Sequence, residues 1–158
     1  MFCFAALADL HTRTMYTNST GALPIQSFGN MQYVVVAYIY DLNAILVRAM
    51  PSKTDGAIIA AFTDILANLN ARGYSPTLNI LDNECSKAIK AHIPSNHMDI
   101  HLIPPHNHRV DAAKSTIART FKEHFITALA TVDRNCLLKL WDDFLPQVEL
   151  TLNLLQFS

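Results

Sequence analysis

The sequence of 158 residues is poor in charge and in glycine, and these shortages exclude several classes of protein. Four glycines and seven prolines are too few for a collagen-like or low-complexity chain, while 51% apolar residues are enough for a real core. Charged side chains make up only 16%, compared with about 25% in a typical domain. This shortage indicates that some apolar surface is covered by a partner or by further chain. A net charge of −1 gives no overall attraction to nucleic acid, so such binding requires a local basic face.

Cysteine and long apolar runs are also scarce, which bears on the compartment. Cys3, Cys85 and Cys136 are odd in number and widely spaced, so they imply no disulfide framework and favour a reducing environment. The longest apolar run, Tyr33–Tyr40, is too short to cross a bilayer. The apolar stretch Met1–Ala8 lacks the basic flank of a signal peptide. We therefore expect an intracellular protein, in the cytoplasm or nucleus, without a membrane partner.

The length and the order of hydrophobic patterns predict one α/β domain spanning residues 1–158. β-branched and aromatic stretches predict strands, and apolar residues at helical spacing predict helices. The expected elements are a strand around Thr14–Thr17, hairpin strands at Met31–Tyr40 and Ala44–Met50, a helix capped by Ser52 or Thr54 that runs to Arg72, a strand at Thr77–Leu81, a helix at Glu84–His92, a strand at Asp99–Ile103, a helix at Val110–Thr131, and a helical region at Leu137–Leu155 that is interrupted or kinked at Pro146. Because the sequence stops directly after an apolar helix, we expect the domain to be truncated at its C-terminal end.

One acidic residue stands where α/β sheets place functional side chains. Asp82 ends a predicted buried strand, and a carboxylate at that point is often a metal ligand. The alternative is that Asp82 caps a helix beginning at Asn83 or Glu84, which the local pattern slightly favours.

Other catalytic patterns are weak or missing. The pairs His106/His108 and His92/His97 have metal-ligand spacing, but no CxxC or HExxH companion supplies the remaining ligands of a zinc site. Scattered loop histidines are more often surface residues. The sequence also contains no GxSxG, P-loop or GxGxxG pattern, so it gives no support to a nucleophilic or nucleotide-binding enzyme.

The helix expected at Val110–Thr131 carries the most informative charge pattern. Its basic residues, with one at its entrance, form a stripe on or near the side opposite Phe121; they are Arg109, Lys114, Arg119 and Lys122. Such a stripe can contact phosphates, although a solvated helix face is the commoner explanation of any single stripe. Nucleic-acid binding by these four residues is therefore a hypothesis.

Six segments, in a fixed order along the chain, resemble motifs of integrases from long-terminal-repeat retrotransposons of the copia/gypsy type. They are Tyr16–Pro24 (similar to YTDxTGxFP), Tyr33–Asp41 (the second core strand), Leu81–Glu84 (similar to DNE or DNG), Pro104–Ala113 (similar to PPHxHRxNAAER), Arg119–Lys122 (RTFK) and Trp141–Asn153 (similar to LWD, LPQ and LTLN in succession). Each segment is weak alone, but together they cover nearly the whole chain.

The resemblance implies a ribonuclease-H-like fold, which is a mixed five-stranded sheet flanked by helices. It also implies a polynucleotidyl transferase in which three carboxylates hold two Mg²⁺ or Mn²⁺ ions. DNA is then the expected partner, together with a second copy of the chain in a homodimer.

The sequence departs from that family at two of the three acidic positions. The first acid falls on Asn18, whose amide oxygen can coordinate a metal but carries no charge, and the second is intact as Asp82. The third falls on Lys114 or, if the match slips by one residue, on Ser115. Asp111 lies one helical turn before Lys114 and is a conceivable substitute ligand. We therefore expect a catalytically impaired integrase core with weak metal binding.

The alternative is a decayed structural or dimerisation module without a DNA role. Five apolar residues of the last helical region, more than a small domain buries easily, predict self-association through helical faces; they are Trp141, Phe144, Leu145, Val148 and Leu152. An active nuclease that uses Asp82 and Asp111 is the least favoured hypothesis.

Overall fold

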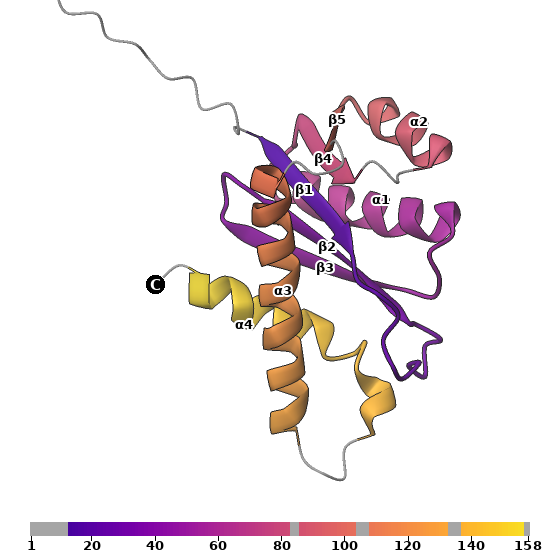
Figure 1. The fold of residues 1–158 in the computed structure, drawn as a ribbon, viewed down its shortest axis with the longest axis vertical. Coiled ribbons are helices and arrows are strands. Elements are labelled where there is room, and N and C mark those ends of the chain that lie inside the picture. Colours follow the sequence, from indigo (N-terminus) through magenta and orange to yellow (C-terminus); the bar gives the residue numbers. More distant parts are fainter. Residues whose placement is uncertain (1–12, 83–85, 104–107, 133–136, 157–158) are drawn as a thin grey trace, which may run out of the picture.

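A computed structural model describes residues 13–82, 86–103, 108–132 and 137–156, and of residues 82, 108–117 and 156 it describes the backbone only. A five-stranded mixed sheet lies between two layers of helices (Figure 1). The elements are β1 (Thr14–Ser19), β2 (Tyr33–Ile39), β3 (Ala44–Met50), α1 (Asp55–Ala71), β4 (Leu78–Asp82), α2 (Lys87–Ser95), β5 (Asp99–Ile103), α3 (His108–Thr131), a short 3₁₀ helix (Leu138–Leu140) and α4 (Leu145–Gln156). This is the α/β architecture that the sequence predicts.

The sheet order is β3-β2-β1-β4-β5. The hairpin strands β2 and β3 are antiparallel, and β2 is antiparallel to β1. From β1 onward the sheet is parallel, because β1 pairs with β4 and β4 with β5 in the same direction. The parallel half therefore brings the carboxyl ends of three strands to one edge.

Alternation along the central strand β2 separates the two cores. Val34 and Val36 contact the layer formed by α3 and α4, whereas Val35, Ala37 and Ile39 contact the layer formed by α1 and α2. All five side chains are buried. A continuous apolar run of this kind is typical of a strand covered on both faces. None of the helices within the described ranges is both long and apolar enough to cross a bilayer.

One predicted helical boundary is wrong, and one of two alternatives for another is confirmed. The helix predicted at Glu84–His92 begins at Lys87, because the Ser86 hydroxyl accepts the Ile89 N–H at 3.2 Å and caps it there. The helical region predicted at Leu137–Leu155 is interrupted, which is one of the two alternatives expected, and is not kinked: α4 begins at Leu145, so Pro146 is its second residue, where a proline removes no intrahelical hydrogen bond.

The apolar residues predicted to drive self-association are instead used within the chain. Trp141, Leu145, Val148 and Leu152 are at most 4% exposed and pack against β2, β3 and α3, while Phe144 is partly buried. The prediction that they form an intermolecular surface is therefore wrong, because the sheet itself covers them.

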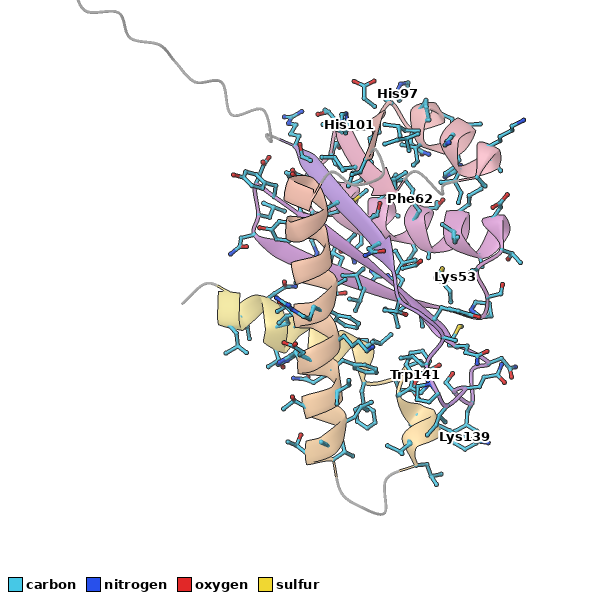
Figure 2. The ribbon with its side chains drawn as sticks, viewed as in Figure 1. Lys53, Phe62, His97, His101, Lys139 and Trp141 are labelled. Atoms are coloured by element: carbon cyan, nitrogen blue, oxygen red, sulfur yellow. The ribbon has the colours of Figure 1, made fainter. Side chains whose placement is uncertain are left out.

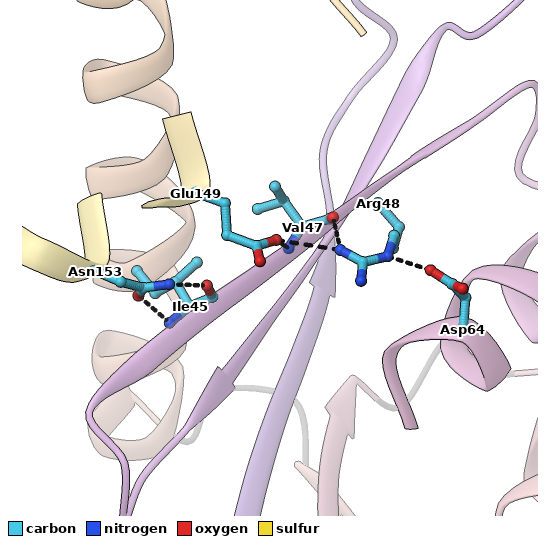
Figure 3. A network of polar contacts seen from close by, with 6 residues as sticks. All are labelled: Ile45, Val47, Arg48, Asp64, Glu149 and Asn153. Atoms are coloured by element: carbon cyan, nitrogen blue, oxygen red, sulfur yellow. Dashed lines mark hydrogen bonds and ion pairs between the residues drawn. The ribbon is translucent and has the colours of Figure 1, made fainter. Parts of the chain in front are cut away.

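The polar side chains of α4 supply hydrogen-bond partners to the backbone of Ile45 and Val47 at the outer edge of β3 (Figure 3). Asn153 accepts the Ile45 N–H through Oδ1 and donates Nδ2 to the Ile45 carbonyl, both at 2.7 Å. One helical turn earlier, Glu149 Oε2 accepts the Val47 N–H at 2.8 Å. Helix α4 thus takes the place of a sixth strand at this edge, which would otherwise be open to pairing with another chain.

Arg48 ties this edge to the opposite helical layer (Figure 3). Its Nη1 donates to the Val47 carbonyl at 2.7 Å and to Glu149 Oε2 at 3.2 Å. Its Nε forms an ion pair with Asp64 of α1. One side chain therefore links the edge strand to α1 and α4 together.

A second set of contacts, which we term the clasp, joins the β1–β2 loop to the segment before α4. Figure 2 labels Trp141 and Lys139 beside this loop. Three hydrogen bonds form the clasp: Trp141 Nε1 to the Ile25 carbonyl (2.9 Å), the Ser27 hydroxyl to Asp142 Oδ2 (2.8 Å) and the Phe28 N–H to the Lys139 carbonyl (2.8 Å). The clasp holds the loop that follows β1 against chain more than a hundred residues away.

Gly29 is a position beside the clasp that has no room for a side chain. A Cβ atom at Gly29 would lie 2.6 Å from Asp142 Oδ2, so the Gly29→Ala variant must displace the carboxylate that accepts from Ser27. We expect the free energy of unfolding to fall by about 1–2 kcal/mol, measured by urea denaturation. Gly56→Ala is the matched control: nothing lies within 4 Å of its Cβ, and alanine favours the first turn of α1.

The same measurement in the Ser27→Ala background identifies the cause. If Gly29→Ala acts by displacing Asp142, its cost shrinks once the Ser27 hydroxyl has gone. An unchanged cost in that background would contradict this account.

Candidate functional site

Asn18 and Asp82 lie at the ends of two neighbouring parallel strands. The register pairs Thr14 with Leu78 and Tyr16 with Ile80, so Asn18 and Asp82 each follow two residues beyond the last of these pairs. Both strands end at the same edge of the sheet, at Ser19 and Asp82. The prediction that the strands carrying these two residues are adjacent is confirmed.

Both positions fall on the face of the sheet that α3 covers. Tyr16 and Ile80 are buried together in a small cluster with Ile103, and positions 18 and 82 follow them by the two-residue period of a strand. Helix α3 packs against β1 and β2 on this side (Figure 1). The two strand ends and α3 therefore surround one region of the molecule.

The Asn18 side chain is partly buried and already has a hydrogen-bond partner. Its Oδ1 accepts the N–H of Ser19 at 2.8 Å. The oxygen of a neutral amide that is engaged in this way is a poorer cation ligand than a carboxylate, which brings a full charge and more acceptor sites.

The remaining predicted ligands belong to the N-terminal part of α3. Asp111 and Lys114 lie in its first two turns, and their spacing puts them on roughly the same helix face, with Ser115 beside them. Their side chains, and those of Asp82 and Arg109, lie outside the described part of the structure. The structure thus gives the position of each residue in its helix or strand, without its side-chain contacts.

The residues at these positions do not fit a two-metal site. At the three positions that the resemblance assigns, Asn18, Asp82 and Lys114, the sequence offers one carboxylate, one neutral amide and one ammonium group, whereas Mg²⁺ prefers several anionic oxygens. Among the described side chains, no three of His, Cys, Asp or Glu are grouped closely enough to hold a metal ion.

The basic stripe has two described members. Arg119 and Lys122 are exposed on α3, near Phe121, which is buried against the sheet. Arg119 Nε lies 4.0 Å from Glu123 Oε1, and both side chains are largely in solvent. An ion pair this long and exposed contributes little, so the guanidinium stays accessible to an anion.

A buried polar pair that sequence reasoning missed lies on the opposite face of the same strands. The Thr17 hydroxyl donates to Asn79 Oδ1 at 2.9 Å, and Thr17 and Asn79 are almost fully buried. This bond joins β1 to β4 beside the positions of Asn18 and Asp82. The sequence shows a polar residue within each of the two predicted strands, but it gives no signal that pairs them.

Two tyrosines lie near the candidate site on the α3 side. The rings of Tyr16 and Tyr38 are 6.2 Å apart, and the Tyr38 hydroxyl donates to Asn43 at 2.9 Å. Burial, and then the neighbouring Tyr40, raise the pKa of Tyr38. Tyr38 therefore stays neutral at physiological pH and acts as a hydrogen-bond donor.

The described histidine contacts give no support to metal binding. His92 Nε2 lies 3.2 Å from the Thr63 hydroxyl and 3.3 Å from Asn96 Nδ2, and its ring packs edge-on against Phe62. These are contacts of a histidine at a helix interface. His106 and the His108 side chain lie outside the described residues.

The predicted capping role of Asp82 is wrong. The N-cap of α2 is Ser86, four residues after Asp82, and its hydroxyl makes the capping hydrogen bond. Asp82 is the last residue of β4, four positions before this N-cap in the sequence. This leaves the metal-ligand hypothesis as the functional interpretation of Asp82.

The fold matches solved structures, although no protein-family model and no curated protein sequence matches the chain. One match is the simian T-cell lymphotropic virus intasome in complex with PP2A regulatory subunit B56 gamma, with a TM-score of 0.70 and 12% identity over 89% of this chain. Another is the catalytic core domain of BIV integrase, with a TM-score of 0.58 and 12% identity over 93% of this chain and 82% of that one. The chain spans about half (48%) of the length of the first. The fold is that of an integrase catalytic core, which is ribonuclease-H-like; at this identity the likeness shows the fold alone.

The two interpretations of Asp82 predict different stabilities. Ser86→Ala removes the cap of α2 and should lower the free energy of unfolding by about 1 kcal/mol in urea denaturation. Asp82→Asn removes no cap, so it should leave stability unchanged, or raise it if the carboxylate is repelled by other negative charge. A loss in Asp82→Asn as large as that in Ser86→Ala would return Asp82 to a structural role.

Proposed function

We propose that residues 1–158 form an integrase-core-like domain of retrotransposon origin that binds nucleic acid and has lost efficient metal-dependent strand transfer. The observation that carries this proposal is that the neighbouring parallel strands β1 and β4 end side by side. Asn18 and Asp82 lie at corresponding positions of these strands, and α3 covers that face of the sheet. The six motif segments support the same assignment, because they carry these positions in the order that integrases have.

The proposed loss of activity follows from charge. A two-metal mechanism requires the ions to activate the nucleophile and to stabilise the leaving oxygen, and each effect contributes several kcal/mol. Only Asp82 supplies a carboxylate at the three family positions, while Lys114 adds a positive charge. We therefore propose weak binding of Mg²⁺ or Mn²⁺ and no detectable Mg²⁺-dependent DNA processing.

Restoring both acids tests this proposal directly. In calorimetric Mn²⁺ titrations, the double variant Asn18→Asp/Lys114→Glu should bind at least about tenfold more tightly than the unmodified chain, since even outer-shell partners of a metal contribute that much. Either single change should do less, because ligands act as a unit.

A charge-matched control separates site formation from general attraction. Asn70→Asp/Lys87→Glu makes the same change in net charge on α1 and α2, on the opposite face of the sheet, and should not alter the affinity. Tight binding of two ions by the unmodified chain would refute the proposed impairment and indicate Asp111 as a substitute ligand. No gain in the double variant would refute the assignment of Asn18 and Lys114.

Nucleic-acid binding is proposed to use the basic stripe of α3. Removing one cation that contacts a phosphate should reduce the slope of log K against log salt by about 0.9 for duplex DNA, so Arg119→Gln/Lys122→Gln should give a shallower slope in fluorescence anisotropy. The control Lys87→Gln/Lys90→Gln removes two cations from α2 and should leave the slope unchanged.

Absence of salt-dependent DNA binding would instead favour the second candidate, an interaction module without a DNA role. A specific observation supports that candidate: the outward face of α4 exposes Leu150, Leu154 and Leu155, each by more than half. These leucines replace the buried residues as the proposed surface of a homodimer.

A further inference from the structure

A groove of about 590 Å³ runs along the outer edge of β3, between α1 and α4. Its lining includes Ala49 of β3, Asn68 and Arg72 from α1 and its C-terminal end, and Leu145 and Leu150 of α4. The volume is that of ordinary ligand sites, which measure roughly 300–1,000 Å³. We term this the edge groove. It lies along the edge strand β3, which β2 separates from β1 and β4, the strands that carry Asn18 and Asp82.

Residues 45, 47 and 49 of β3 point their backbone N–H and C=O groups away from the sheet. Among these three, Ala49 is the one whose backbone groups lack a hydrogen-bond partner in the described structure. Asn153 satisfies Ile45, and Glu149 with Arg48 satisfies Val47. The next position in this helical series, four residues before Glu149, is Leu145, which has no polar atom to offer. Within the described residues, neither the N–H nor the C=O of Ala49 has a hydrogen-bond partner beyond the sheet.

This pair of open backbone groups fits an extended peptide. One residue of a β-strand donates its N–H and accepts through its C=O in the same plane, which is how peptides add to an exposed sheet edge. Leu145 and Leu150 offer apolar walls beside it. The groove also contains a buried acceptor, Asn68 Oδ1, that has no partner within the described residues.

The charge at the groove specifies the peptide further. Arg48 pairs with both Glu149 and Asp64, and Asp142 accepts a hydrogen bond from the neutral hydroxyl of Ser27. Arg72, at the end of α1, is exposed and has no ion pair among the described side chains. The two cations and two carboxylates that line the groove balance in formal charge, and Arg72 is the lining cation that has no carboxylate partner among the described side chains.

We propose that the edge groove binds an extended peptide segment that carries an acidic side chain, in which one peptide residue pairs with the backbone of Ala49 and the carboxylate meets Arg72. The proposal is independent of the proposed DNA-binding function, since it uses neither Asn18, Asp82 nor the basic stripe, but the groove shares Leu150 and Leu154 with the proposed dimer surface.

The test uses the full chain labelled with ¹⁵N and a defined probe, the acetylated and amidated peptide Thr-Val-Thr-Val-Asp. Millimolar peptide should shift the Ala49 amide resonance and slow its hydrogen exchange. A matched peptide ending in Asn should bind about three- to fivefold more weakly, the usual size of an exposed ion pair. Arg72→Gln should abolish that difference between the peptides, whereas the control Lys90→Gln should keep it.

Two further peptides test the backbone pairing. They carry N-methyl groups at alternate backbone nitrogens, so only one of them blocks the N–H that faces Ala49, and only that one should fail to bind. The proposal is overturned if Ala49 does not respond, if both methylated peptides bind equally, or if Arg72→Gln leaves the preference for Asp intact. It is also overturned if the Ala49 resonance shifts with protein concentration alone, which would identify a second copy as the occupant.

Discussion

The structure depends on a match between the spacing of a helix and the spacing of a strand. Four residues of helix advance about 6 Å and two residues of strand about 6.8 Å, so Asn153 and Glu149 of α4 reach Ile45 and Val47 of β3 in succession. The edge of the sheet is thereby closed by side chains instead of by another strand. Because this holds α4 in place, its apolar face can cover β2 and β3, and Arg48 carries the connection through to α1.

Most of the fold could be predicted from local patterns. The bounds of β3 and β5 are those expected, and α1 ends before Gly73, whose positive φ suits glycine. The failures have one physical cause: a single-sequence pattern records that a side chain is apolar or polar, without recording what it contacts. The apolar residues around Trp141 are buried by their own sheet, and the cap of α2 is Ser86 instead of the nearby acidic residue.

The candidate site was predictable to the same depth. Asn18 and Asp82 could be assigned to neighbouring strand ends because the motif order implies that topology, and strand pairing agrees with it. The bond between Thr17 and Asn79 could not be predicted, because it joins residues 62 positions apart through a register that only the folded sheet defines. The clasp is hidden for the same reason, since its two sides are more than a hundred residues apart in sequence.

The closure of β3 by α4 also sets an order of events during synthesis. The N–H of Val47 finds its acceptor 102 residues later in the chain. At ribosomal rates of roughly 5–20 residues per second, about 5–20 s separate the emergence of the strand from that of the helix that closes it. For that interval the outer edge of β3 in the nascent hairpin has unpaired backbone groups. Chains on neighbouring ribosomes of one message then expose the same unpaired strand to each other. A holding chaperone that recognises extended apolar segments would act in that window, before the last helix ends the need for it.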